Sequence, residues 1–376
     1  MNLHVTSTRA AADGFVCRAT DSLWTAIERA LDNGFGLVFV TGGDGEALGR
    51  LTLGDLRRAL RDGAHLGNAS LGGIVRPGSL DDADSPVAPA LDAGGRIVGI
   101  ERKPGAAFLP VAEPDLSHAE LRNLMDAFLS TWISSTGDYI TRFETSFAAR
   151  TGMSHGVATS NGTVSLHLAL AALGIGPGDE VIVPDLTFAA SANVVIHLGA
   201  TPVLVDVDPL TWCVSPEAIE RTITPRTRAV MPVHVFGRPA PMTEIRELAL
   251  RHGLFVVEDC AEAHGASYDG QPVGSFSDVA SFSFFANKIV TTGEGGICVT
   301  NDADLARRMR MLRDHGMRPE RRYWHEEAGY NFRMTNLQAS IGCAQLDRMD
   351  AFLDMRRKVH EGYEAALGHL PGIAFP

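Results

Sequence analysis

Hydrophobic and polar positions alternate over short distances in the N-terminal part of the chain. Apolar spacing predicts a helix over Leu23 to Leu31, and an apolar run predicts a short buried strand over Gly36 to Val40. The turn residues TGGDGE follow, then a second strand that ends at Leu51 and a helix that starts in TLGDLRRAL. A further hairpin is expected around Ala93 to Gly95, because a Gly-rich turn between two apolar runs favours one.

From about residue 116 the pattern changes. Helical segments reach Thr151, and a helix is predicted over Val164 to Leu173, ended by Gly174. Continuous apolar, β-branched runs between helices predict strands of a parallel sheet that is covered on both faces. Such sheets bind ligands at the carboxyl ends of their strands. The predicted strands are Glu180 to Val183, Pro202 to Val207, Ala229 to Val235, Leu254 to Glu258 and Val279 to Phe285.

These patterns predict an α/β protein with three parts. Residues 1–110 form a small α+β domain, which ends in a Gly- and Pro-rich stretch, and residues 111–325 form a large domain around the mostly parallel sheet. Residues 326–376 start a C-terminal small domain. A chain of 376 residues with 45% hydrophobic and 21% charged residues is long enough for two or three such cores.

Charge and cysteine content exclude several classes of function. The net charge is -12 and no basic stripe occurs, which argues against a nucleic-acid partner. Five scattered cysteines without a C-x-x-C pair indicate neither a disulfide framework nor a zinc site, and they fit the reducing cytoplasm. No run of about eighteen apolar residues occurs, so no membrane contact is expected. His264, His315 and His325 have no ligand spacing, and no metal is predicted.

Four segments carry the candidate chemistry in a fixed order. They are SNGTVSLHLAL at 160–170, PDLTFAAS at 184–191, VVEDCAEAHG at 256–265 and SFSFFANKIVTTGEGG at 281–296. Together they resemble the DegT/DnrJ/EryC1/StrS family of pyridoxal-phosphate (PLP) dependent sugar aminotransferases, from about residue 111 to the end. RYWHEEAGYNFRMTN and EDCAEAHG place the resemblance nearest the perosamine synthase-like branch. It implies the type I, aspartate aminotransferase fold for the PLP-binding large domain.

The resemblance assigns Lys288 and Asp259 to catalysis. PLP needs an amine that bonds covalently to its aldehyde, and Lys288 follows a buried strand on a turn, where we expect it to be partly buried. The ring nitrogen keeps its proton only opposite a sheltered carboxylate, and Asp259 stands at the polar end of its strand. Taken alone, a surface lysine and a turn aspartate remain the simpler interpretations.

The other cofactor contacts follow from the same resemblance. Gly162 and Thr163 open a helix, whose N-terminus favours a phosphate, although N-G-T is also an ordinary helix cap. Ser283 is implied as a hydroxyl ligand of that phosphate, and Asn331 as a ligand from the neighbouring subunit of a homodimer. Phe188 is implied to stack on the ring, or else to belong to the core. For the last contact, Glu262 replaces the Gln that contacts the ring hydroxyl in many relatives.

Residues 13–62 resemble a single CBS motif, with Thr52 and Asp55 in GRLTLGD as contacts for an adenosine nucleotide. The same pair also matches a capping box for the helix that follows. CBS motifs work in pairs, and a second motif is not recognisable here. We therefore expect weak nucleotide binding at most, and a docking or dimerising role for this domain.

The resemblance implies a reaction as well as a cofactor. An amino group would pass from glutamate to C4 of a nucleotide-diphospho-4-keto-6-deoxy sugar for cell-surface polysaccharide synthesis, with a GDP-linked sugar favoured over a UDP-linked one. His325 would line the sugar site. A PLP-dependent sugar dehydratase is an alternative, although its relatives carry histidine where Lys288 stands. A non-catalytic regulator that binds a nucleotide and PLP is another. Relatives usually continue beyond the equivalent of LPGIAFP, so the small domain is expected to be truncated.

Overall fold

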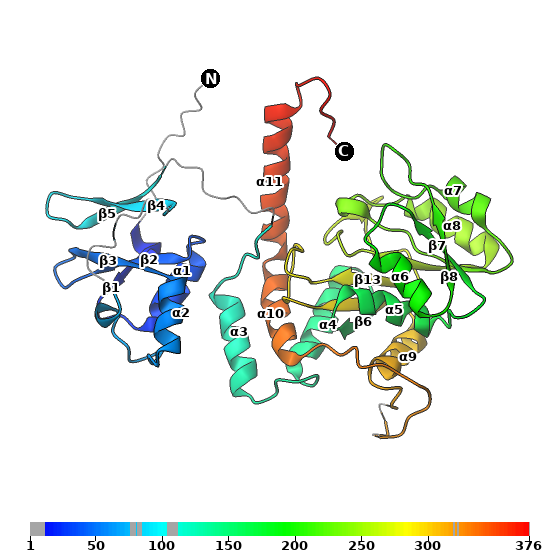
Figure 1. Cartoon of the computed structure of the whole chain (residues 1–376), viewed down its shortest axis with the longest axis horizontal. Coiled ribbons are helices and arrows are strands. Elements are labelled where there is room, and N and C mark those ends of the chain that lie inside the picture. Colours follow the sequence, from blue (N-terminus) through cyan, green and yellow to red (C-terminus); the bar gives the residue numbers. More distant parts are fainter. Residues whose placement is uncertain are drawn as a thin grey trace. The chain divides into compact units, whose positions relative to one another are not determined.

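The computed structural model describes residues 12–75, 80, 85–103, 112–318, 320–321 and 323–375. The chain divides into two compact units, Met1–Leu121 and Arg122–Pro376 (Figure 1). The predicted boundary between residues 110 and 111 lies outside the described residues.

The N-terminal unit is a small α+β domain with a three-stranded sheet in the order β1-β2-β3 and a separate β4-β5 hairpin. Strand β1 runs parallel to β2, and β3 runs antiparallel to it. The predicted hairpin around Ala93 to Gly95 is confirmed, because it joins β4 to β5. The elements are η1 (Ala12–Gly14), β1 (Val16–Arg18), α1 (Leu23–Asp32), β2 (Leu37–Thr41), β3 (Ala47–Thr52), α2 (Leu53–Arg61), η2 (Leu71–Gly73), β4 (Val87–Leu91) and β5 (Ile97–Arg102).

The larger unit alternates strands and helices after two initial helices, the first of which begins before the boundary at Leu121. Within the described residues, its elements follow in chain order. They are α3 (His118–Leu129), α4 (Asp138–Arg150), β6 (His155–Thr159), α5 (Gly162–Ala172), β7 (Glu180–Pro184), α6 (Ala190–His197), β8 (Thr201–Val205), α7 (Pro216–Thr222), β9 (Thr227–Val230), η3 (Val235–Gly237), α8 (Met242–His252), β10 (Phe255–Asp259), β11 (Ser267–Tyr268), β12 (Gln271–Pro272), β13 (Val279–Ser283), β14 (Gly296–Thr300), α9 (Ala303–Arg313), α10 (Asn336–Asp347) and α11 (Met349–Leu367).

A seven-stranded sheet in the order β6-β14-β13-β10-β9-β7-β8 forms the centre of this unit. Strand β14 is antiparallel to both neighbours, and the other pairs are parallel. Successive side chains of a strand face opposite sides. Val279 accordingly belongs to the core that contains residues of α5, α6 and α9, whereas Ala280 belongs to the core that contains residues of α4 and α10. The mostly parallel, doubly covered sheet that the apolar runs predict is therefore confirmed.

Three predicted strands are too long. The run Ala229 to Val235 ends its regular pairing at Val230, since Pro232 has no N–H to donate to a ladder. Beyond it, Val233 forms a single bridge with Asp259. The runs ending at Val207 and Phe285 stop at Val205 and Ser283 instead.

The last helices differ in burial. The apolar side of α10 lies in the same core as α4, whereas α11 buries only Met349 and Phe352 at its start. Within the described residues, no helix combines the length and the apolar character that a membrane crossing requires.

Candidate active site

Lys288 lies on the turn that follows β13. Its backbone N–H donates to the carbonyl oxygen of Phe285 at 2.9 Å, which fixes the turn. The side chain is 18% exposed, as expected for a partly buried amine, and Nζ lies 3.5 Å from Oε1 of Glu262. A flexible lysine side chain is thereby directed toward the loop after β10.

Glu262 connects this lysine to a second loop. Its Oε2 accepts the backbone N–H of Phe236 at 2.9 Å, so each carboxylate oxygen has its own partner. Phe236 is 74% exposed and has φ 51°, a left-handed conformation that is uncommon for a bulky residue. Its ring meets that of Trp212 edge to face at 5.9 Å. The sequence did not indicate either aromatic residue.

Asp259 ends β10 and is 4% exposed. Its Oδ2 accepts the hydroxyl of Ser191 at 2.8 Å, and its Oδ1 accepts the N–H of Ala261 at 3.1 Å. Burial raises the pKa of this carboxyl above its ordinary value, against the opposing effects of these hydrogen bonds and of the nearby charge of Lys288. A cationic partner stabilises the charged form of a buried carboxylate. No described residue forms a salt bridge with Asp259.

Phe188 lies on the turn between β7 and α6. Its side chain is 77% exposed, so the alternative that it belongs to the core is wrong. The turn is tied to Asp259, because Ser191 donates its hydroxyl to that carboxylate at 2.8 Å and its backbone N–H to the Phe188 carbonyl oxygen at 3.1 Å. An exposed aromatic ring thus stands on a segment attached to the buried carboxylate.

The N-terminus of α5 meets the end of β13. Asn161 caps the helix by accepting the N–H of Val164 at 3.0 Å. A Cβ added to Gly162 would lie 2.7 Å from Cβ of Ser283 and 3.1 Å from its Oγ. Only glycine permits this approach, which places a hydroxyl beside the open N–H groups that a helix presents in its first turn, at Gly162 and Thr163. An anion is favoured at such a place.

Asn331 is exposed and lies between two anchored aromatic residues. The rings of Tyr330 and Phe332 stack at 4.5 Å, and His167 of α5 packs edge-on against both of them. The backbone N–H of Phe332 donates to Arg313 at 3.1 Å. Among the described residues, no hydrogen bond or ion pair joins Asn331 to Lys288, and the Asn331 backbone forms a single bridge with Asp314.

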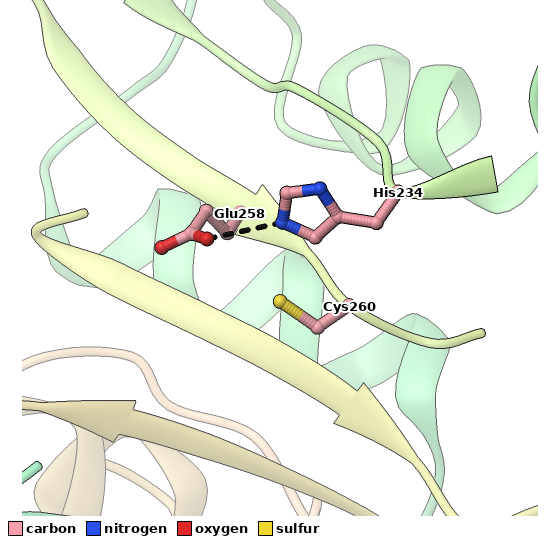
Figure 2. Close-up of side chains that lie close together, drawn as sticks. All are labelled: His234, Glu258 and Cys260. Carbon is pink, nitrogen blue, oxygen red and sulfur yellow. Dashed lines mark hydrogen bonds and ion pairs between the residues drawn. The ribbon is translucent and has the colours of Figure 1, made fainter. Parts of the chain in front are cut away.

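Glu258 and Cys260, the two chain neighbours of Asp259, form a buried group with His234. Their possible ligand atoms all lie within 4.8 Å of one another, and Figure 2 shows the imidazole and the carboxylate pointing toward each other. Nε2 of His234 is 3.0 Å from Glu258, and its Nδ1 accepts the N–H of Ala240 at 3.0 Å. The imidazole nitrogens are therefore already occupied.

The rest of this group is saturated in the same way. Glu258 also accepts the N–H groups of Gly274 and Phe276 and the hydroxyl of Ser277. Burial raises the pKa of the Cys260 thiol well above its ordinary value, which disfavours a thiolate ligand. These contacts make the group a buried link between β10 and the segment that follows β9.

The three histidines singled out in the sequence do not form one site. His264 is buried among Phe147, Phe282 and Phe284, and burial lowers its pKa to about 3. His325 is exposed, and its Nδ1 lies 2.8 Å from the carbonyl oxygen of His315.

Thr52 and Asp55 of the N-terminal unit cap α2. Each accepts the other's backbone N–H, and the Thr52 hydroxyl donates to Asp55 at 2.7 Å. Asp55 lines a cavity of about 530 Å³ with Arg50 and Arg58, whereas Thr52 lines a neighbouring cavity of about 320 Å³. The capping-box alternative is thus realised, and the two residues line different cavities.

The arrangement of the larger unit fits PLP. The parallel topology brings four groups together at the carboxyl ends of the strands. They are the amine after β13, the buried carboxylate at the end of β10, the exposed aromatic ring after β7 and the anion cradle at the start of α5. These groups match the aldehyde, the ring nitrogen, the ring face and the phosphate of the cofactor. The close approach of Gly162 and Ser283 is the most specific element of this match.

Known proteins support the same interpretation. The model of the DegT/DnrJ/EryC1/StrS aminotransferase family matches residues 114–376, and the CBS domain model matches residues 12–62. GDP-perosamine synthase of Caulobacter vibrioides is 54% identical over 262 residues, which cover 70% of this chain and 71% of that protein. GDP-perosamine synthase of Escherichia coli O157:H7 is 48% identical over 263 residues, with coverages of 70% and 72%. The PLP form of the sugar aminotransferase Spr1654 from Streptococcus pneumoniae superposes with a TM-score of 0.66 at 31% identity, covering 69% of this chain and 72% of that one.

Proposed function

The chain belongs to the DegT/DnrJ/EryC1/StrS aminotransferase family, and we propose that it moves an amino group from glutamate to C4 of a GDP-linked 4-keto-6-deoxy sugar. It is a PLP-dependent nucleotide-sugar aminotransferase. The observation that carries the choice of sugar is the 54% identity to GDP-perosamine synthase. All the proposed cofactor residues lie in the segment that the family model matches.

Lys288 and Asp259 are the proposed catalytic residues. PLP supplies an electron sink for the carbon that gains or loses the amine. Lys288 holds the cofactor and then moves the proton at the reacting carbon as a general base and acid. Asp259 keeps the ring nitrogen protonated, and this pairing offsets the cost of burying its charge.

The remaining residues bind the cofactor in this proposal. Thr163, with Gly162 and Ser283, holds the phosphate at the N-terminus of α5. Phe188 covers the ring, and Glu262 contacts the ring hydroxyl from the position where it now meets Lys288.

Asn331 completes the cofactor site of a second copy, which makes the proposed enzyme a homodimer. The support is its exposed position between Tyr330 and Phe332, which are anchored on α5 by His167. A two-fold dimer presents the same segment to both sites. Asn331 of each subunit therefore reaches the cofactor site of the other subunit. His325 lies on the same segment and is proposed to line the sugar pocket.

The N-terminal unit is proposed to act in docking or dimerisation, with weak adenosine nucleotide binding at most. The support is the mutual pairing of Thr52 and Asp55, which leaves half of a CBS-type site with little free hydrogen-bonding capacity. The five free, buried cysteines favour a reducing, cytoplasmic compartment for the enzyme.

The acceptor is tested with purified protein, PLP, glutamate and two 4-keto sugars, one linked to GDP and one a UDP-linked 2-acetamido sugar. Formation of 2-oxoglutarate measures turnover. We expect kcat/KM to favour the GDP-linked sugar by about tenfold or more, which lies within the range that pocket contacts supply. Equal turnover of both, or preference for the UDP-linked sugar, contradicts the proposed acceptor and leaves the family unaffected.

A further inference from the structure

Ser191 is a fully buried hydroxyl at the start of α6, and it joins separate parts of the site. Its Oγ lies 2.8 Å from Oδ2 of Asp259 and 2.8 Å from Oγ1 of Thr187. Its third contact is the carbonyl oxygen of Phe188 at 3.3 Å. A single side chain therefore touches the buried carboxylate and two residues of the turn that carries the exposed ring.

The direction of these hydrogen bonds follows from counting protons. A serine hydroxyl has one proton to donate and two lone pairs, and an ionised carboxylate only accepts. Ser191 therefore donates to Asp259, and Thr187 donates to Ser191. The result is a chain of two hydroxyls that ends on a charge, and consecutive hydrogen bonds of this kind strengthen one another.

This hydrogen-bond chain of Thr187 and Ser191 has an electrostatic effect on Asp259. Removal from water disfavours the charged carboxylate, and the Ser191 hydrogen bond is the largest opposing contribution. Hydrogen bonds to charged groups are stronger than those between neutral groups. A change at Ser191 therefore acts on the charge that the proposed cofactor ring requires.

The hydrogen-bond chain also has a geometric effect. Asp259 and Phe188 are proposed to contact the nitrogen and the face of one ring, so their separation must match that ring. Residues 187 and 191 flank Phe188, and both of their hydroxyls belong to the chain. Ser191 thereby sets where the aromatic ring stands relative to the carboxylate.

We propose that Ser191 is a positioning residue for PLP, which aims the Asp259 carboxylate and couples it to the turn that carries Phe188. The inference rests on the proposed function through the cofactor alone, and it does not depend on the identity of the sugar.

The test compares three variants of the full chain, Ser191→Ala, Thr187→Val and Ser340→Ala. Ser340 is the matched control, because it is also a fully buried helix serine, and its hydroxyl donates at 2.8 Å to the carbonyl of Leu337, outside the cofactor residues. Thr187→Val removes the outer hydroxyl at nearly constant shape. Each protein is stripped of PLP, and the dissociation constant for added PLP is measured by equilibrium dialysis.

Loss of a hydrogen bond to a charged group predicts PLP binding about ten- to a hundredfold weaker for Ser191→Ala. Thr187→Val should lie between this variant and the unsubstituted protein, and Ser340→Ala should bind PLP normally. The pH dependence of the visible spectrum of bound PLP should move in Ser191→Ala and not in Ser340→Ala, which a purely structural role would not produce.

Equal PLP affinity and spectra for Ser191→Ala and Ser340→Ala would overturn the inference, whether both are normal or both are weakened. A different result would overturn the proposed function, namely that the unsubstituted protein itself does not bind PLP. The two failures are therefore distinguishable in one experiment.

Discussion

Gly162 and Ser283 approach each other so closely that a Cβ on Gly162 would lie 2.7 Å from Cβ of Ser283. The two residues are distant in sequence and lie on α5 and β13, so the contact joins the helix N-terminus to the strand that leads to Lys288. A real Cβ at this distance forces backbone or side-chain movement at the proposed phosphate cradle.

Gly162→Ala should therefore weaken PLP binding by about tenfold or more, because overpacking of this kind typically costs 1–3 kcal/mol. The control is Gly362→Ala on α11, where an added Cβ meets nothing within 4 Å. That variant should bind PLP normally and gain about 0.5–1 kcal/mol of stability from its helix propensity. Equilibrium dialysis measures PLP affinity, and thermal unfolding measures stability. Unchanged PLP affinity in Gly162→Ala would contradict the proposed phosphate cradle.

Asp259 gives a pH prediction for the protein without cofactor. Its folded pKa is raised by burial, so between the ordinary and the raised value the folded state binds more protons than the unfolded state. Stability is then fully present below the ordinary pKa and is lost as the pH rises through the folded one. Asp259→Asn cannot ionise, so its apoprotein should be more stable than the unsubstituted apoprotein at pH 7. The same variant loaded with PLP should turn over on the order of 10²-fold more slowly or worse.

Glu258 provides the opposite case on the same strand. His234, Ser277 and Gly274 hold its pKa below the ordinary value despite burial, so its contribution is present above the ordinary pKa and lost as the pH falls. Glu258→Gln should therefore be less stable than the unsubstituted protein at pH 7. Thermal unfolding of the Asp259→Asn and Glu258→Gln apoproteins is measured against pH. A stability change of the same sign in the two variants at pH 7 would contradict the opposite pKa shifts assigned to the two carboxyl groups.

The shared active site is tested by mixing two inactive variants. Lys288→Ala lacks the amine, and Asn331→Ala lacks the proposed contact to the partner's cofactor. In a mixed dimer one site combines Lys288 of one subunit with Asn331 of the other, and it is intact. Activity should therefore return after joint refolding. If Asn331 acted in its own subunit, no mixture would restore activity beyond that of Asn331→Ala alone.

The N-terminal unit should bind AMP only weakly. Thr52 and Asp55 pair with each other, and half a site must still overcome several kcal/mol of lost translational and rotational freedom. Calorimetry of the full chain with AMP should show no saturable binding at micromolar concentration. A micromolar dissociation constant that Asp55→Ala abolishes would instead identify the unit as a nucleotide sensor.

Much of the site could be predicted where its signals are local. The N-G-T sequence marks the start of α5, and Lys288 follows a buried apolar strand closely enough for its turn to be placed. Ser191 could not be found in this way, because its hydrogen bond to Asp259 spans 68 positions and arises only when the sheet brings β7 and β10 near each other. Phe236 likewise meets Glu262 across 26 positions.

The ends of strands were harder to predict than their existence. Apolar character continues from Ala229 to Val235, and only the missing N–H of Pro232 indicates that the regular ladder stops. The left-handed backbone at Phe236 has no signature in composition or spacing.

The central claim is that this chain transfers an amino group and that Lys288 is required for it. The most direct measurement supplies glutamate labelled with ¹⁵N in its amine, together with a GDP-linked 4-keto-6-deoxy sugar and PLP, and follows the label by mass spectrometry. The account predicts ¹⁵N bonded to C4 of the sugar and equal formation of 2-oxoglutarate with the unsubstituted chain, and no labelled sugar with Lys288→Ala. A sugar product without the label, or equal labelling by Lys288→Ala, would contradict it.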